Sequence, residues 1–303
     1  MSHQASYLHL FTNGELARRV EKAYEKLSGC DLCAHTCRAN RLGGRTGVCG
    51  ADDLARVSSY GPHFGEEDVL VGRGGSGTIF FSGCNLQCIF CPNWDISQNG
   101  EGEEFTAGEL AGIMVKLQER GCHNINLVTP TPYLPSILAA LNIAAAHGLD
   151  LPLVYNCGGY ESLTALKLLD GVVDIYMPDV KFADDETGRR LSGAKNYFTA
   201  VKIALKEMHR QVGNLQLDER GMAYHGLIVR HLVLPGDLAG TETVVNFIAG
   251  EISRNTYINV MAQYYPAFRS EDFPPLNRRL SSGEYEAAVK VARAAGLHRF
   301  AKG

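Results

Sequence analysis

The chain has 303 residues, of which 45% are hydrophobic and 20% are charged. These values are typical of a globular protein with ample core and exclude an intrinsically disordered chain. A net charge of −4, without any block of like charges, argues against nucleic acid as the main partner.

The sequence also shows no membrane or export signal. The opening residues, MSHQASYLHLFTNGE, lack the basic-then-apolar pattern of a secretory leader, and no run of about 18 apolar residues occurs. We therefore expect a cytoplasmic protein with no membrane partner. Nine cysteines in such a chain indicate metal ligands rather than disulfides, because the cytosol keeps thiols reduced.

The first predicted element is a helix. Thr12 or Asn13 is a suitable cap for the amphipathic stretch GELARRVEKAYEKL, which ends at Gly29. The segment CDLCAHTCRANRLGGRTGVCG follows directly, and its Gly and Arg content without apolar periodicity indicates a loop wrapped around a metal. Its cysteines are Cys30, Cys33, Cys37 and Cys49.

Two metal centres are compatible with these four cysteines. Four thiolates can close a tetrahedral zinc site or hold an auxiliary 4Fe-4S cluster. Zinc would staple this loop-rich segment without redox activity, whereas a cluster would relay electrons or anchor a substrate. The sequence leaves both alternatives open.

A second cysteine group follows an apolar segment at 78–81. Cys84, Cys88 and Cys91 lie in the run GCNLQCIFCPN, and no fourth cysteine stands at local spacing. A 4Fe-4S cluster normally takes four cysteines, so a triplet suggests one iron left open for a substrate or cofactor. The alternative is a zinc site completed by a histidine such as His63 or His123.

From residue 78 onward, apolar runs alternate with helical patterns, which indicates a parallel sheet with crossover helices. Strands such as INLVT are apolar on both faces, as a sheet covered on both sides requires. The pattern is compatible with a barrel, complete or incomplete, and with an open doubly wound sheet. In each case ligand sites gather at the carboxyl ends of the strands, where the cysteine triplet falls. The predicted strands are 78–83, 124–129, 151–157, 173–180, 227–234 and 257–262, and the predicted helices are 106–120, 134–147, 161–170, 196–211, 241–252 and 282–295.

With these residues in view, the chain resembles the radical S-adenosylmethionine (SAM) superfamily, in particular its pyruvate formate-lyase activating enzyme-like branch of uncharacterised homologs. The likeness covers nearly the whole chain. Beyond the triplet it includes HFGEE at 63–67, GSGTIFFSGCN at 75–85, NINLVTPTPYLP at 124–135, YNCGGYE at 155–161, DIYMPDVK at 174–181 and RHLVLPG at 230–236.

The resemblance implies an α/β fold, a partial (βα)6 TIM-like barrel with a cysteine-rich N-terminal extension. It also implies a 4Fe-4S cluster that binds SAM and cleaves it reductively to methionine and a 5′-deoxyadenosyl radical. Cys84, Cys88 and Cys91 would then bind three irons, and SAM would chelate the fourth. We place the N-terminal helix and four-cysteine segment in residues 1–65 and the barrel in 66–303.

Residues near the triplet and the second strand are implied to contact SAM. Phe90 would lie along the adenine, with a core aromatic as the alternative, and Asn93 would shape the cluster loop. Many superfamily members carry a Gly-Gly-Glu run for the SAM amino group, but the matching place here reads VTPTP. Thr129 and Thr131 offer carbonyl and hydroxyl acceptors there, although the carboxylate is missing.

The later strands are implied to complete the SAM site. Asn156 matches a polar position near the SAM ribose, and Met177 and Asp179 match the next strand. Lys181 lies two residues beyond Asp179 on the same strand face and would point at the SAM carboxylate, as His231 could. The alternatives are an ordinary salt bridge for Asp179 and Lys181 and a structural role for His231.

Three functions are compatible with the sequence. The leading one is a radical SAM oxidoreductase that abstracts hydrogen from a protein or peptide, for example by activating a glycyl radical in a partner. The second is a radical SAM enzyme acting on a small molecule. The third is a non-enzymatic Fe-S or zinc protein used in electron transfer or assembly. Both enzyme readings imply a flavodoxin or ferredoxin as reductant.

Overall fold

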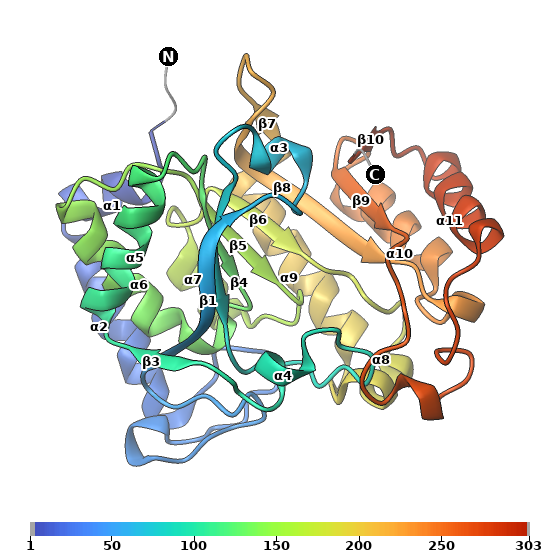
Figure 1. The fold of residues 1–303 in the computed structure, drawn as a ribbon, viewed down its shortest axis with the longest axis horizontal. Coiled ribbons are helices and arrows are strands. Elements are labelled where there is room, and N and C mark those ends of the chain that lie inside the picture. The colour runs from blue at the N-terminus through green and yellow to red at the C-terminus, as the bar shows by residue number, and fades with distance from the viewer. Residues whose placement is uncertain (1–3, 302–303) are drawn as a thin grey trace.

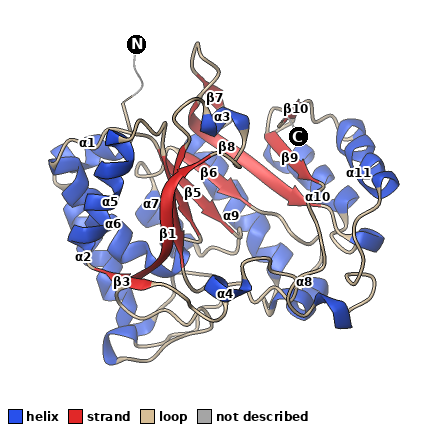
Figure 2. Ribbon diagram, in the orientation of Figure 1, coloured by secondary structure: helices blue, strands red, loops and turns tan. Residues whose placement is uncertain are grey.

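The computed structural model describes residues 4–301. Helices α1 (Tyr7–Thr12), α2 (Glu15–Glu25), α5 (Ala107–Glu119) and α6 (Leu134–Ala146) lie together on one side of a central sheet (Figure 1). Figure 2 shows the strands of this sheet between the helices. The predicted α/β class is confirmed.

The central sheet contains ten strands in the order β10-β9-β8-β6-β5-β4-β2-β1-β3, with β7 paired to β8. From β10 to β2 the neighbours are parallel, whereas β1 is antiparallel to both β2 and β3. The bounds are β1 Ala55–His63, β2 Ser76–Phe81, β3 Glu103–Phe105, β4 Ile125–Val128, β5 Leu153–Cys157, β6 Ile175–Pro178, β7 Gln216–Leu217, β8 Ala223–Leu232, β9 Tyr257–Met261 and β10 Arg299–Phe300.

The six predicted strands correspond to β2, β4, β5, β6, β8 and β9, so the predicted, mostly parallel sheet is confirmed. Among residues 4–301 the strand order has two separate ends, β3 and β10, as a partial barrel requires. The segment 213–226, a polar excursion in sequence, holds β7 and the start of β8. β1 was not predicted, because it contains Gly61 and Pro62 and is half-exposed.

Local capping signals account for where several helices begin. Thr106 and Ser281 start α5 and α11, and each forms a capping box with the glutamate three residues on. The unpredicted α8 begins after Asp184, whose carboxylate accepts the backbone N–H groups of Glu186 and Thr187. The remaining bounds are α3 Asp68–Val71, α4 Trp94–Ser97, α7 Leu163–Leu169, α8 Asp185–Ser192, α9 Tyr197–Val212, α10 Thr241–Phe247 and α11 Ser282–Ala294.

The largest apolar core packs the helices, α6 among them, against the sheet. Most of α6 is buried, including Leu134, Leu138 and Leu141. Although α6 is strongly apolar, none of the helices in residues 4–301 has the length and hydropathy needed to span a bilayer. This packing holds the parallel strands rigidly, so that their carboxyl ends present side chains in defined positions.

The importance of this core can be tested with Leu141→Ala, because Leu141 is fully buried. Removing its side chain from a close-packed core is expected to lower the free energy of unfolding by about 2–5 kcal/mol. Urea denaturation measures this change. The control is Ile203→Ala on α9, where the side chain is 49% exposed and the expected change is within about 0.5 kcal/mol. Equal losses in both variants would contradict the assignment of the core.

Candidate functional site

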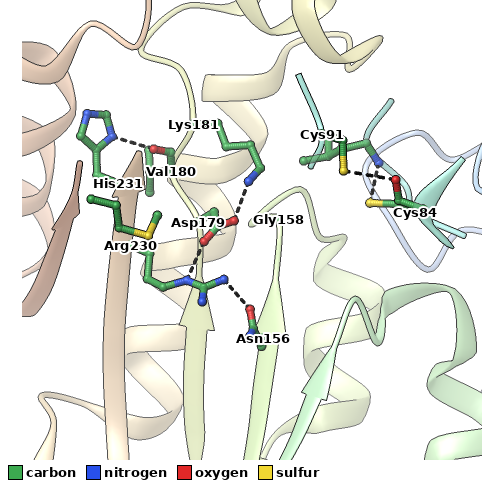
Figure 3. Close-up of polar contacts among 12 residues, drawn as sticks. Cys84, Cys91, Asn156, Gly158, Asp179, Val180, Lys181, Arg230 and His231 are labelled. Carbon is green, nitrogen blue, oxygen red and sulfur yellow. Dashed lines mark hydrogen bonds and ion pairs between the residues drawn. The ribbon is translucent and has the colours of Figure 1, made fainter. Parts of the chain in front are cut away.

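The cysteine triplet lines a cavity of about 380 Å³ inside the partial barrel. This volume lies in the range of small-molecule sites, about 300–1,000 Å³. Cys84, Cys88 and Cys91 form one side of the cavity, and Asn156, Asp179, Lys181 and Arg230 line it from the ends of β5, β6 and β8. Figure 3 shows Cys84 and Cys91 across from these polar side chains.

The loop after β2 holds the cysteines by its own hydrogen bonds. The backbone N–H of Leu86 donates to Cys84 Sγ at 3.3 Å, and Cys91 Sγ lies 3.3 Å from Ser97 Oγ on α4. The N–H of Cys91 donates to the carbonyl of Cys88 at 3.1 Å. Two of the three sulfurs therefore already have a polar neighbour of the kind that orients metal ligands.

Burial keeps the thiols of Cys84 and Cys88 protonated when no metal is bound. It raises the pKa of Cys84 to about 12 and also raises that of Cys88, while the nearby Lys181 partly opposes both shifts. Metal binding at the triplet must therefore displace protons.

The donor set fits an iron-sulfur cluster better than a single ion. Each cysteine of a 4Fe-4S cluster binds a different iron, so its sulfurs line a cavity rather than meet at one point. Within residues 4–301, no three His, Cys, Asp or Glu groups converge on a single-ion site. Of the two histidines considered for zinc, His63 lines the cavity, but His123 Nε2 accepts the N–H groups of Arg73 and Gly74.

Opposite the thiols, a buried ion-pair network joins three strand ends. Arg230 donates from Nε to Asp179 Oδ1 at 2.7 Å and from Nη2 to Asn156 Oδ1 at 2.6 Å. Lys181 Nζ lies 2.5 Å from Asp179 Oδ2. Although burial opposes ionisation, Arg230 and Lys181 hold the pKa of Asp179 below its usual value. The salt bridge considered from sequence exists, and it also faces the cavity.

Arg230 was not singled out from the sequence, which pointed to its neighbour His231. The His231 ring is fully buried, with Nδ1 2.7 Å from the carbonyl of Val180 and Nε2 3.0 Å from Thr241 Oγ1. Burial lowers the pKa of His231, which favours a neutral, structural ring. A charged residue within the predominantly apolar run LIVRHLVL at 227–234 was the signal that could have identified Arg230.

The remaining predicted SAM contacts fall into two groups. Phe90, Asn93 and Thr129 line the cavity. Thr129 has a positive φ of 59°, an uncommon conformation for a threonine and one that often marks functional sites. Phe90 also packs edge-on against Phe182 and Tyr264, so a core role and a cavity role coexist in one side chain.

Met177 and Thr131 do not reach this cavity. Met177 is fully buried in a separate apolar cluster inside the barrel. Thr131 donates its hydroxyl to Glu161 Oε1 at 2.8 Å and lines the pocket of the N-terminal cysteines. Their positions along the chain suited a SAM contact, but the turn after β4 directs Thr131 away from the cavity.

The motif HFGEE adds a carboxylate to the cavity wall. Glu66 lines the cavity and lies 3.5 Å from Arg230 Nη1. Burial raises the pKa of Glu66, although Arg230 opposes the shift. Its neighbour Glu67 accepts a hydrogen bond from Asn259 at 2.9 Å. Glu66 therefore belongs to the candidate site.

The four N-terminal cysteines line a second, smaller pocket of about 20 Å³. Burial raises the pKa of Cys33 and Cys49, and the neighbouring cysteines add to both shifts. The four thiols that the sequence grouped therefore line one pocket, although no three of them converge on a single-ion site within residues 4–301. Asn85 of the triplet loop lines the same pocket, so the two cysteine groups are neighbours.

Comparison with known proteins gives a consistent family assignment. The model of the radical SAM superfamily matches residues 78–216. An uncharacterised protein, MJ0674, of Methanocaldococcus jannaschii is 36% identical over 284 residues, which cover 90% of this chain and 77% of that protein. The pyruvate formate-lyase-activating enzyme of Clostridium pasteurianum is 27% identical over 158 residues, covering 48% of this chain and 64% of the enzyme.

Among solved structures, the chain is similar to SuiB of Streptococcus suis bound to its precursor peptide SuiA, with a TM-score of 0.45 and 12% identity. The match covers 73% of this chain and 46% of SuiB, so the chain spans about half the length of that protein.

The charge state of Glu66 makes a pH-dependent prediction. Burial raises the pKa of Glu66 in the folded protein above 4.5. The protonated form of Glu66 therefore stabilises the folded state at low pH, and this stabilisation is lost as the pH rises through the folded-state pKa. Relative to Glu66→Gln, which stays neutral, the wild type should lose free energy of unfolding as the pH rises from below the ordinary carboxyl pKa of 4.5 toward neutrality. Urea denaturation across this range measures the difference.

An exposed carboxylate provides the control for this measurement. Lys206 holds the pKa of Glu251 below its usual value, so the comparison with Glu251→Gln should have the opposite sign. A difference between wild type and Glu66→Gln that does not change with pH would contradict the raised pKa.

Proposed function

This chain belongs to the radical SAM superfamily, and on that premise we propose that it is an enzyme that cleaves SAM in the cavity described above. The observation that supports the proposal best is the shared cavity, in which three cysteines face the network of Asp179, Lys181 and Arg230. The family implies a 4Fe-4S cluster and SAM as cofactors. Such a cluster, when bound, supplies the electron that cleaves SAM to methionine and a 5′-deoxyadenosyl radical.

The side chains of the cavity would divide the work of binding and orientation. Cys84, Cys88 and Cys91 would hold the cluster. Phe90 and Thr129 would contact SAM, the first through its ring and the second through its backbone carbonyl. Asn93, at the start of α4, would shape the loop around the cluster. The mostly apolar packing behind Phe90 would help to exclude water.

Lys181 is the best candidate for binding the SAM carboxylate. Despite its burial, Asp179 holds the pKa of Lys181 above its usual value, so its side chain is a charged ammonium. Of its three N–H donors, one is directed to Asp179. Asp179 would position this ammonium, and Arg230 with Asn156 would position Asp179. Met177, Thr131 and His231 have no direct part in this proposal.

We propose a protein or peptide as the substrate, with glycyl-radical activation as one form of the reaction. This part rests on the likeness to the pyruvate formate-lyase-activating enzyme. The proposal includes a low-potential flavodoxin or ferredoxin as electron donor and a cytoplasmic location, without nucleic acid or membrane partners.

A second candidate is a radical SAM enzyme that acts on a small molecule. The charged cavity lining favours it, because Glu66 and Arg230 could bind ionic groups of a compact substrate. The third hypothesis is a non-enzymatic electron-transfer protein. Such a protein needs no cavity of this kind beside its cysteines, so the cavity argues against it.

We also propose that Cys30, Cys33, Cys37 and Cys49 hold a second metal centre, zinc or an auxiliary 4Fe-4S cluster, in a segment comprising residues 1–65. The proposal is supported by the four thiols that line one pocket. The barrel of residues 66–303 would carry the SAM chemistry.

The first test is anaerobic reconstitution of the wild type and of a variant that combines Cys84→Ala, Cys88→Ala and Cys91→Ala. With dithionite as reductant, 5′-deoxyadenosine should form from SAM in the wild type only, because the variant lacks the cluster ligands. Metal analysis should give about four irons with one zinc, or about eight irons, in the wild type. A fully loaded wild type that neither binds nor cleaves SAM would contradict the proposal.

The proposed role of Lys181 is tested with Lys181→Met in the cluster-loaded protein. Loss of a charge-assisted hydrogen bond worth about 1.5–3 kcal/mol should weaken SAM binding by roughly 10- to 100-fold. Equilibrium binding of SAM provides the measurement. Lys206→Met is the matched control, since Lys206 pairs with Glu251 on the exposed surface. Unchanged SAM affinity in Lys181→Met would exclude this contact.

A further inference from the structure

The segment with the four N-terminal cysteines packs directly behind the triplet loop. In Figure 1 this segment, in blue, lies at the lower edge of the molecule, on the side of α4. Regular structure within residues 30–54 is limited to one 3-10 turn, Arg41–Gly43, and an isolated β-bridge between Cys33 and Glu161. The contacts between the segment and the loop therefore come from individual side chains and backbone groups.

One of these contacts acts on the peptide group next to a triplet cysteine. His35 Nε2 lies 2.8 Å from the carbonyl oxygen of Asn85. Because a carbonyl only accepts hydrogen bonds, Nε2 is the protonated nitrogen and donates. The same peptide group carries the N–H of Leu86, which donates to Cys84 Sγ at 3.3 Å. The peptide is planar and trans, so fixing its carbonyl also directs its N–H.

This arrangement links His35 to the sulfur through a single rigid group. A hydrogen bond accepted by the carbonyl polarises the peptide and strengthens the bond that its N–H donates. Hydrogen bonds to ligand sulfurs are among the factors that set the reduction potential of an iron-sulfur cluster. His35 is therefore placed to influence Cys84 without touching it.

Further contacts hold the same stretch of loop against the N-terminal segment. Gln87 Nε2 donates to the carbonyl of Val48 at 3.1 Å. Gly83 has a positive φ of 77°, and a side chain there would lie 2.6 Å from the carbonyl oxygen of Cys49, so only glycine allows this approach. The loop is thus held from behind on both sides of Cys84.

Tyr160 supports His35 from the barrel side. Its carbonyl accepts both Asn85 Nδ2 at 2.9 Å and the N–H of Ala34 at 3.3 Å. The His35 and Tyr160 rings meet edge to face, with centroids 5.0 Å apart. His35 therefore has a defined orientation, as a positioning residue requires.

We propose that His35 is a positioning residue for the cluster loop. Through His35, the four-cysteine segment controls how tightly the triplet binds its cluster and what reduction potential the cluster has. This inference rests on the proposed function, because it presumes a cluster at Cys84, Cys88 and Cys91. The segment has little regular structure, so metal binding by its four cysteines would give it the rigidity that His35 needs. His35 would act on the triplet loop in the same way whether the N-terminal centre is zinc or an auxiliary cluster.

The test compares His35→Leu, which removes the donor, with His35→Gln, whose amide can donate to the same carbonyl. Asn40→Ala is the control, because Asn40 caps the turn at Gly43 in the same segment. Each full-length protein is reconstituted anaerobically and challenged with a ferrous chelator, and the reduced cluster is titrated by electron paramagnetic resonance. Iron held outside the triplet is measured in the variant that lacks Cys84, Cys88 and Cys91 and is subtracted.

We expect His35→Leu to lose triplet iron about 10-fold faster than wild type and to show a lower reduction potential. We expect His35→Gln to recover most of both properties and Asn40→Ala to resemble wild type. Cys37→Ser, which removes one ligand of the N-terminal centre, should change iron loss and potential in the same direction as His35→Leu.

Wild-type behaviour in His35→Leu would overturn the role of His35. If Asn40→Ala changed iron loss and reduction potential as much as His35→Leu, the cause would be a general loosening of the N-terminal segment. That result would also overturn the role of His35. Wild-type behaviour in Cys37→Ser would overturn control by the N-terminal centre. Failure of the proposed function is distinguishable, because it would show as absence of a triplet cluster in the wild type itself.

Discussion

The cavity depends on the buried guanidinium of Arg230. It binds Asp179 and Asn156 at once and so joins the ends of three parallel strands, β5, β6 and β8. An unpaired charge in such a place costs several kcal/mol, so Arg230 and Asp179 each require the other. The second oxygen of Asp179 then fixes the ammonium of Lys181. One ion pair thus sets the positions of the polar groups that face the cysteines.

The side of the cavity that carries Cys84, Cys88 and Cys91 is formed by a loop rather than by strand ends. The triplet lies in the loop after β2, which is held by α4 on one side and by the N-terminal segment on the other. The rigid sheet supplies charged side chains, and the adaptable loop supplies soft sulfur ligands. A cofactor that combines a cluster with an ionic small molecule needs both kinds of wall, which supports the proposed chemistry.

Much of the fold could be predicted because its signals are local. Strands such as β4 and β5 are short apolar runs between turns, and α5 and α11 begin with capping boxes. β1 was missed because Gly61 and Pro62 weaken its strand pattern, and its pairing with β2 forms only through contacts distant in sequence. Helix α8 was missed because it is short and mostly polar, although Asp184 marks its start.

For the candidate site, the sequence by itself determined the two cysteine groups, the polar residues at the ends of the strands, and the family that they resemble. Spacing and residue type suffice for these. Only the tertiary structure decided that Arg230 rather than His231 faces the cavity, that Thr131 points to the other pocket, and that Glu66 joins the wall. Neighbouring strand residues point to opposite faces, and which face is the cavity depends on what packs against each side of the sheet.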